Sequence, residues 1–147
     1  MTKVLDNWLS EYSESHQNHT NQLLHRICVP AIFFSLLGIF WSIPVGHTNF
    51  AVIAIVLAMF FYVRLGLKAV LLILPQIAIS VLILYYWSQQ SSTWQLSLAI
   101  FIVAWIGQFI GHKIEGKKPS FLEDVKFLLI GPIWLLHFIC KRIGIRY

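Results

Sequence analysis

Residues 67–87 read LKAVLLILPQIAISVLILYYW, and no charged side chain follows Lys68 within this stretch. A helix needs about 20 predominantly apolar residues to cross the hydrocarbon core of a bilayer, so the stretch predicts a membrane span. Three further apolar stretches approach this length, although the second and third of them are short: Ile27–Ile43, Phe50–Val63 and Gln95–Gly111. We therefore expect about four spanning helices.

The composition of the whole chain agrees with this reading. Hydrophobic residues make up 58% of the 147 residues, charged residues make up 12%, and the mean hydropathy is +0.73. A soluble domain of ordinary composition has about a quarter of its residues charged, which excludes a typical soluble enzyme. The length suits one domain. We predict an all-α, polytopic transmembrane bundle that forms a single domain over residues 1–147.

The basic residues predict the orientation of the bundle. Lysine and arginine occur before the first span, between the second and third, and after the fourth, whereas the other two connections carry none. This asymmetry places the N-terminus in the cytoplasm, and it accounts for the net charge of +5 without a nucleic-acid partner. A fifth apolar stretch, Val125–Cys140, would carry Lys141, Arg142 and Arg146 to the opposite side if it crossed. We therefore expect it to be re-entrant or interfacial, with both termini cytoplasmic.

The segment before the first span predicts two helices with a break between them. Apolar residues recur at Val4, Leu5, Trp8, Leu9 and Tyr12, the pattern of an amphipathic helix that lies on the membrane surface. Asn18 or Thr20 would cap the second helix and leave His16 in the intervening turn. On one unbroken helix His16 and His25 would lie about half a turn out of phase, so the break is what lets them approach each other.

Two groups of polar residues predict a metal site at the cytoplasmic face. The first contains His16, Asn18, Asn21 and His25, and the second contains Gln108, His112 and Glu115 at positions i, i+4 and i+7 of one helix face. We expect His16, His25, His112 and Glu115 to bind the metal, and Asn18, Asn21 and Gln108 to orient the ligands. Without a thiolate the set suits iron(II), manganese or zinc.

The remaining histidines and the cysteines receive weaker assignments. His19 is a less suitable ligand than His16 because it would lie just inside the helix, and His47 is expected to be interfacial. His137 is left open between a further ligand and an interfacial residue. Cys28 and Cys140 are expected to be buried thiols, since they form no CxxC pair.

At these residues the sequence resembles the iron(II)-dependent 2-hydroxy fatty acid dioxygenases. The resemblance rests on Tyr12-x3-His16-x-Asn18-x2-Asn21-x3-His25-x4-Pro30 and on Gln108-x3-His112-x2-Glu115-Gly-Lys-Lys-Pro119, and it spans nearly the whole chain. It implies an Fe(2+) cofactor, O₂ as co-substrate, and shortening of a long-chain 2-hydroxy fatty acid by one carbon in α-oxidation. It also implies that His16, His25 and His112 are essential. Nearby, Lys113, Lys117 and Lys118 would attract the substrate carboxylate.

Two other classes of function are weighed against this one. The chain would be a membrane-shaping scaffold if its histidines bind no metal, or a metal-dependent lipid hydrolase if it binds metal but consumes no O₂. The oligomeric state and the host membrane are left open: the inner membrane in a bacterium, or the endoplasmic reticulum membrane in a eukaryote.

Overall fold

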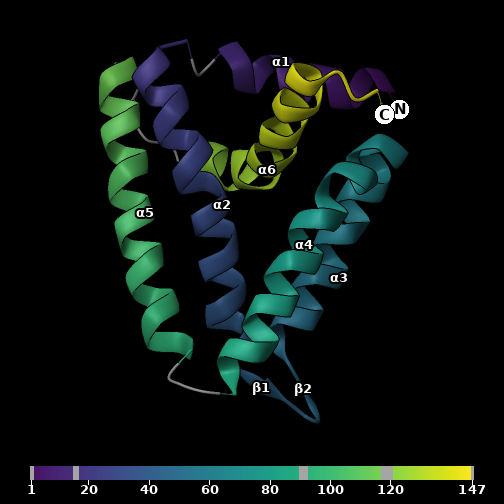
Figure 1. Cartoon of the computed structure of the whole chain (residues 1–147), viewed down its shortest axis with the longest axis vertical. Coiled ribbons are helices and arrows are strands. Elements are labelled where there is room, and N and C mark those ends of the chain that lie inside the picture. Colours follow the sequence, from purple (N-terminus) through teal and green to yellow (C-terminus); the bar gives the residue numbers. More distant parts are fainter. Residues whose placement is uncertain (1, 15–16, 90–92, 117–120, 147) are drawn as a thin grey trace.

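A computed structural model of the chain describes residues 2–14, 17–89, 93–116 and 121–146, and within them the side chains of 5–14, 17–89, 93–116 and 128–146. These residues form six helices and one short β-hairpin, so the predicted all-α fold is confirmed with a small addition (Figure 1). The elements are α1 (Thr2–Glu14), α2 (His19–Trp41), β1 (Pro44–Val45), β2 (Thr48–Asn49), α3 (Phe50–Leu65), α4 (Leu67–Ser88), α5 (Thr93–Glu115) and α6 (Phe121–Ile143).

Two helix pairs build the body of the molecule. Helix α2 packs along α5 and α3 packs along α4, and the two pairs spread apart toward the end that carries both chain termini (Figure 1). We call this the terminal end, and we call the opposite one the hairpin end because the β-hairpin lies there. Helices α2, α4 and α5, with 23, 22 and 23 residues, are long and apolar enough to cross a membrane. Helix α3 is apolar but has 16 residues, fewer than a full span needs.

Local signals in the sequence explain where α3 and α4 begin and end. The Asn49 side chain accepts a hydrogen bond from the backbone N–H of Ala51 at 3.1 Å and caps α3. A single residue, Gly66, joins α3 to α4 with φ at +114°. Residues with a side chain rarely adopt this conformation, so glycine makes the tight reversal possible. The reversal brings Arg64 and Lys68 to the terminal end (Figure 1).

Helix α6 stays at the terminal end of the bundle and does not run along its length (Figure 1). It contains Pro132, which cannot donate a backbone hydrogen bond inside the helix. Two side chains of the α3–α4 pair bind carbonyl groups beside this proline. The Tyr62 hydroxyl donates to the Leu129 carbonyl at 2.8 Å, and the Gln76 amide donates to the Pro132 carbonyl at 2.9 Å. These two hydrogen bonds hold α6 against α3 and α4 at the proline.

Helix α1 is amphipathic as predicted, but its apolar face does not lie against lipid. Leu5, Leu9 and Tyr12 are buried in the main hydrophobic core of the protein. The Trp8 ring contacts Phe61 of α3, and the Trp134 indole of α6 donates a hydrogen bond to the Ser13 hydroxyl at 2.9 Å. The expectation of a surface-bound helix is therefore corrected: α1 and α6 together cover the terminal end, which buries the apolar stripe inside the protein.

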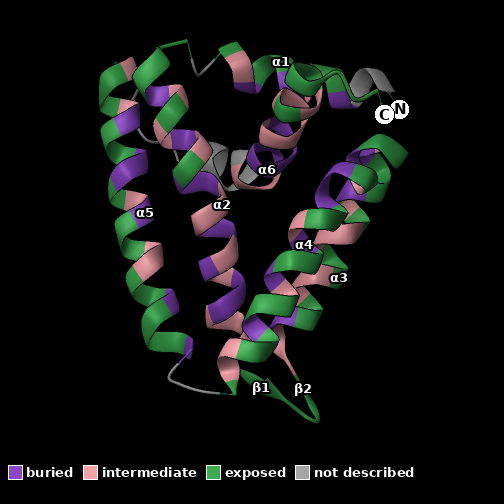
Figure 2. Ribbon diagram, viewed as in Figure 1, coloured by how far each residue is buried: buried purple, intermediate pink, exposed green. Residues whose placement is uncertain are grey.

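The outer faces of α3, α4 and α5 are largely exposed (Figure 2). Large apolar side chains are among the exposed residues of each helix, such as Phe60 on α3, Leu82 on α4 and Val103 on α5. Contiguous exposed apolar surface of this kind marks a face that meets lipid. The polar and charged residues discussed below lie mainly at the terminal end or between α2 and α5.

Candidate metal centre

The N-terminus of α2 fixes the first polar group. Asn18 is the N-cap, as one of the two alternatives predicted, and its side chain accepts from the backbone N–H groups of Thr20 at 2.9 Å and Asn21 at 3.3 Å. The helix then starts at His19, so the predicted break after α1 is confirmed. Asn21 and His25 lie one turn apart on α2 and are both buried, with exposed fractions of 1% and 3%.

Glycines on α5 create the space in which these side chains lie. A Cβ atom on Gly111 would stand 2.2 Å from Asn21 Oδ1 and 3.0 Å from His25 Cε1, and one on Gly107 would stand 2.4 Å from Cys28 Sγ. Both distances to Asn21 and Cys28 are far inside van der Waals contact, so α2 packs directly against the bare backbone of α5. We call this contact the α2–α5 seam.

Two imidazoles meet across the seam. The ring centroids of His25 and His112 are 5.8 Å apart with an interplanar angle of 89°. Two imidazoles that bind one metal through nitrogens about 2.1 Å from it hold their ring centroids roughly 5–6 Å apart. The observed spacing therefore suits a shared ion. His112 is half-buried, and Lys113 beside it is exposed.

A backbone hydrogen bond orients the His25 ring. Its Nδ1 lies 2.9 Å from the Asn21 carbonyl, which can only accept, so Nδ1 carries the proton and donates it. The lone pair of the neutral ring is then on Nε2. Metal-binding histidines commonly use one ring nitrogen as donor to a carbonyl and the other as ligand. Tyr12 of α1 lies edge-on to the same ring, with centroids 6.4 Å apart.

Two buried amide oxygens along the seam have no hydrogen-bond donor among the residues that the structure describes. They are Asn21 Oδ1 and Gln108 Oε1. A buried acceptor without a donor costs about 1–3 kcal/mol, so such atoms normally serve a bound group or an ordered water. Their position on the two helices that carry His25 and His112 fits the predicted role of Asn21 and Gln108 in orienting ligands.

Glu115 connects the two groups of polar residues. Its Oε1 accepts a hydrogen bond from the backbone N–H of Asn18, which ties the C-terminal turn of α5 to the start of α2. The predicted spacing therefore does bring Gln108, His112 and Glu115 to the face that meets α2. Asn18 acts here through its backbone and as a helix cap, and not as a side chain directed at an imidazole.

The structure places the other predicted residues as follows. His16, Lys117 and Lys118 lie outside the described residues. Within the described part of the chain, no group of three or more His, Cys, Asp or Glu side chains is gathered to hold a metal ion. The predicted site has three imidazoles. Two of them, His25 and His112, belong to the described residues, and the third is His16. Both cysteines are free thiols; Cys28 is buried and Cys140 is half-buried.

The weaker histidine candidates separate from this pair. His19 is the first residue of α2 and is exposed, and His47 is exposed in the β-hairpin at the opposite end. His137 lines a different pocket, together with residues of α1 and α4. None of the three belongs to the seam.

Sequence reasoning missed the residues that shape the site without binding a metal. Gly107 and Gly111 form a GxxxG pattern, which is a known signal for close helix packing in membranes and was available in the sequence. Tyr12 of α1 lies edge-on to His25, and its ring is 5.0 Å from that of Trp134 of α6. No local pattern announces that contact, because it joins residues distant in sequence.

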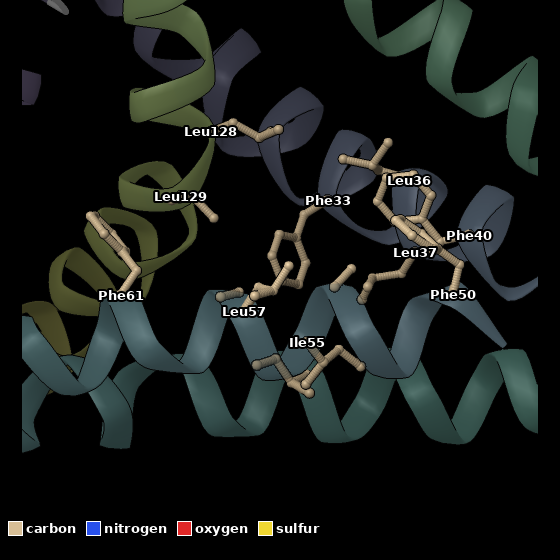
Figure 3. A pocket seen from close by; sticks show the side chains of 13 residues that line it. Phe33, Leu36, Leu37, Phe40, Phe50, Ile55, Leu57, Phe61, Leu128 and Leu129 are labelled. Atoms are coloured by element: carbon tan, nitrogen blue, oxygen red, sulfur yellow. The ribbon is translucent and has the colours of Figure 1, made fainter. Parts of the chain in front are cut away.

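An apolar cavity of about 380 Å³ lies deeper in the bundle (Figure 3). Its walls come from α2, α3, α4 and α6, and Figure 3 shows the aromatic rings and aliphatic side chains pointing into it. Leu128 lines the cavity and also packs against the cluster of Cys28, Ile32 and Ala104 in the seam. The lining consists of Phe33, Leu36, Leu37, Phe40, Phe50, Ala54, Ile55, Leu57, Ala58, Phe61, Ile77, Leu128 and Leu129.

The donor set fits a metal that accepts imidazole ligands, such as iron(II), manganese or zinc, better than a thiolate-bound metal. The rings of His25 and His112 lie edge to face across the seam, and the thiol of Cys28 packs against Gly107. His25 and His112 are the described residues that would hold the ion.

Comparison with known proteins identifies the family of the chain. The family described as 2-hydroxy-palmitic acid dioxygenase Mpo1-like matches residues 2–143. The chain is 29% identical over 148 residues to the 2-hydroxy-palmitic acid dioxygenase MPO1 of Saccharomyces cerevisiae, with 92% of this chain and 79% of the yeast protein covered. No solved structure matches the chain. The resemblance drawn from the histidine motifs is thereby confirmed, and the chain belongs to the Mpo1-like family.

Proposed function

We propose that this protein is an iron(II)-dependent dioxygenase that removes the carboxyl carbon of long-chain 2-hydroxy fatty acids. The observation that carries the proposal is the pair formed by the buried His25 and the half-buried His112 in the α2–α5 seam, in a chain that belongs to the Mpo1-like family. Ionisable groups inside a membrane bundle are costly and usually functional. The yeast relative, named as a 2-hydroxy-palmitic acid dioxygenase, supports the reaction class.

In this proposal His25, His112 and His16 hold the iron, with Glu115 as a further carboxylate ligand. When bound, the iron would supply open coordination positions for O₂ and for the 2-hydroxy acid. The protein's part is to position its ligands. The Asn21 carbonyl keeps the proton on His25 Nδ1, and the packing of α2 against Gly111 holds that ring in place.

The substrate is proposed to lie with its carboxylate at the terminal end and its tail in the bundle. Lys113, with Lys117 and Lys118, would attract the carboxylate from the end of α5. His25 and Phe40 are fifteen residues apart on α2, which corresponds to about 22 Å along the axis. This is the order of an extended long acyl chain, and the apolar cavity of Figure 3 lies along the part of that length from Phe33 to Phe40. We propose that the cavity receives the tail.

The proposed reaction balances without a further co-substrate. One 2-hydroxy acid and one O₂ give the acid shortened by one carbon, CO₂ and water. The substrate loses four electrons and O₂ accepts four. Neither 2-oxoglutarate nor a flavin or nicotinamide is required, in keeping with a chain in which we find no nucleotide-binding motif.

The proposed location is a membrane, with both termini and the metal site on the cytoplasmic side. Support comes from the fold, which gathers the basic connections, both termini and the imidazole pair at the terminal end (Figure 1). Single cysteines introduced near the C-terminus, in a background without Cys28 and Cys140, should react with an impermeant thiol reagent only after the membrane is opened. Labelling from outside in intact cells would contradict this orientation.

The reaction is tested with purified protein, iron(II), O₂ and a 2-hydroxy C16 acid. We expect the C15 acid and CO₂ by mass spectrometry, with one O₂ consumed per product formed. Iron-loaded protein that gives no shortened acid across several chain lengths would leave the scaffold reading in place. Hydrolysis of an ester-linked lipid without O₂ consumption would favour the hydrolase instead.

A further inference from the structure

A second pocket opens at the terminal end, between helices that do not form the seam. It has a volume of about 560 Å³. Its walls come from α1, the first turn of α4, the last turns of α6 and the tail after α6. The lining residues are Leu5, Asp6, Lys68, His137, Lys141, Gly144, Ile145 and Arg146.

The charge of this lining is strongly unbalanced. Lys68, Lys141 and Arg146 contribute three cations, and Asp6 contributes one carboxylate. The pKa of His137 is lowered by burial and by the nearby charges of Lys141 and Lys68, against the opposing effect of Asp6. Burial, the largest of these effects, does not depend on the sign of the surrounding charge, so the excess of three cations over one carboxylate is what makes the pocket positive. The pocket is therefore suited to an anion.

The position of the pocket indicates which anion it meets. Lys68 is the second residue of α4, a candidate membrane span, so the pocket lies where that span ends. Headgroups of the bilayer lie at the same level. Gly144, the buried Leu5 and the exposed Ile145 complete the wall, and Ile145 is the apolar side chain that could meet the apolar part of a lipid. Basic pockets at the ends of membrane helices bind anionic headgroups in this way.

We propose that this pocket binds the headgroup of an anionic phospholipid, through its phosphate, as a site separate from the metal centre. Lys141 and Arg146 are the principal contacts, and Lys68 approaches from the opposite wall. None of the lining residues belongs to the seam or to the apolar cavity. A lipid bound here would join α1, α4 and α6, which the chain connects only through distant segments.

The experiment compares neighbouring cations on α6. Lys141 lines the pocket, whereas Arg142 is exposed and does not, so Lys141→Ala and Arg142→Ala remove equal charge from adjacent positions. Full-length protein in neutral detergent is titrated with phosphatidylglycerol, and the bound lipid is counted by native mass spectrometry. Each cation near an anionic headgroup contributes about fivefold in affinity. We expect about a fivefold loss for Lys141→Ala, about 25-fold for Lys141→Ala with Arg146→Ala, and less than about twofold for Arg142→Ala.

Two further arms identify the ligand, and a third measurement controls for stability. Phosphatidylcholine, which has no net charge, should bind much more weakly than phosphatidylglycerol, and millimolar inorganic phosphate should not displace the lipid. Equal losses for Lys141→Ala and Arg142→Ala would show general charge attraction and overturn the proposal. Displacement by inorganic phosphate would overturn the lipid assignment and identify a free-phosphate site. The thermal unfolding temperature of each variant should stay near that of the parent, because the three cations exchanged are exposed.

Discussion

The two helix pairs of this bundle differ in what they bury. Between them α2 and α5 carry six of the buried polar residues that the structure describes: Asn21, His25, Ser35, Thr93, Ser97 and Gln108. The α3–α4 pair carries one, Ser80. Polar groups inside a membrane bundle cost free energy, so their concentration in one pair supports the proposed location of the metal site in that pair. The other pair is an apolar wall.

The same contrast appears in how closely the helices approach. On α2 and α5, Gly38, Gly107 and Gly111 each leave no room for a Cβ atom, because a side chain of the opposite helix fills the space. In the α3–α4 pair Gly66 makes the turn between the helices, and the buried residues of α4 include larger side chains such as Leu72 and Ile73. Of the two helix pairs, the one that carries the two imidazoles is the one in which glycines bring the helices close together.

The largest effect should come from removing the imidazoles. His25→Ala and His112→Ala should each abolish retained iron and lower turnover of a 2-hydroxy acid by more than about 100-fold, beyond the effect of losing an outer-shell group. Ser80→Ala, which removes a buried polar group from the other pair, should leave both quantities nearly unchanged. Iron content by mass spectrometry and product formation are measured on the same preparations. An unchanged iron content in both histidine variants would contradict the assignment of the metal site to the α2–α5 seam.

Substitutions at two glycines can distinguish a loss of helix packing from a loss of iron binding. Gly111→Ala would place a Cβ atom 2.2 Å from Asn21 Oδ1, and Gly38→Ala would place one 2.0 Å from Ser97 Oγ, farther along the same seam. Overpacking of this kind costs roughly 1–3 kcal/mol, so both variants should unfold at lower temperature. Gly111→Ala alone should also lose iron, since it displaces the side chains beside His25. Similar iron loss in Gly38→Ala would mean that seam stability, and not local geometry, controls the metal.

A smaller effect is expected from the two amide oxygens. Asn21→Ala and Gln108→Ala should weaken iron binding by roughly 10–100-fold without abolishing it, because these residues orient ligands. Ser97→Ala is the matched control, as its buried hydroxyl also lacks a partner among the described residues but lies away from the imidazoles. Competition with a calibrated chelator gives the affinities. Wild-type affinity in both amide variants would show that the amides only pack.

The smallest change should be one of substrate preference. Phe40 packs edge-on against Phe50, with ring centroids 4.9 Å apart, at the hairpin end of the apolar cavity. Phe40→Ala should lengthen the cavity and shift the preferred 2-hydroxy acid toward longer chains by a few-fold, of the order that one or two methylenes contribute to a hydrophobic pocket. Phe60→Ala, on the exposed face of α3, should leave the chain-length profile as it is. An unchanged profile in Phe40→Ala would place the acyl chain elsewhere.

Much of this architecture follows from the sequence. The apolar stretches predicted the long helices, and Asn18 was one of the two predicted caps for α2. The spacing of Gln108, His112 and Glu115 placed all three toward α2, because a helix repeats every 3.6 residues. The capping residues also predicted that the first long helix begins in the polar segment before the apolar stretch at Ile27, and α2 does begin at His19.

The remainder depends on contacts between segments that are distant in sequence. An amphipathic pattern in α1 indicates an apolar stripe but not whether lipid or protein covers it, and here α6 does. The apolar cavity is lined by residues of α2, α3, α4 and α6. The basic pocket is lined by residues of α1, α4 and α6 and of the tail after α6. The contact of Gly111 with His25 was partly foreseeable from the GxxxG pattern, but the pattern does not name its partner.

X-ray absorption at the iron edge of the purified protein tests the central claim most directly. If the α2–α5 seam is the catalytic centre, protein isolated with iron(II) should show nitrogen and oxygen ligands with the outer-shell scattering of at least two imidazoles, and the spectrum should change when a 2-hydroxy acid is added. The claim would be contradicted if the protein retained no iron after incubation with excess iron(II), or if the bound iron showed no imidazole scattering.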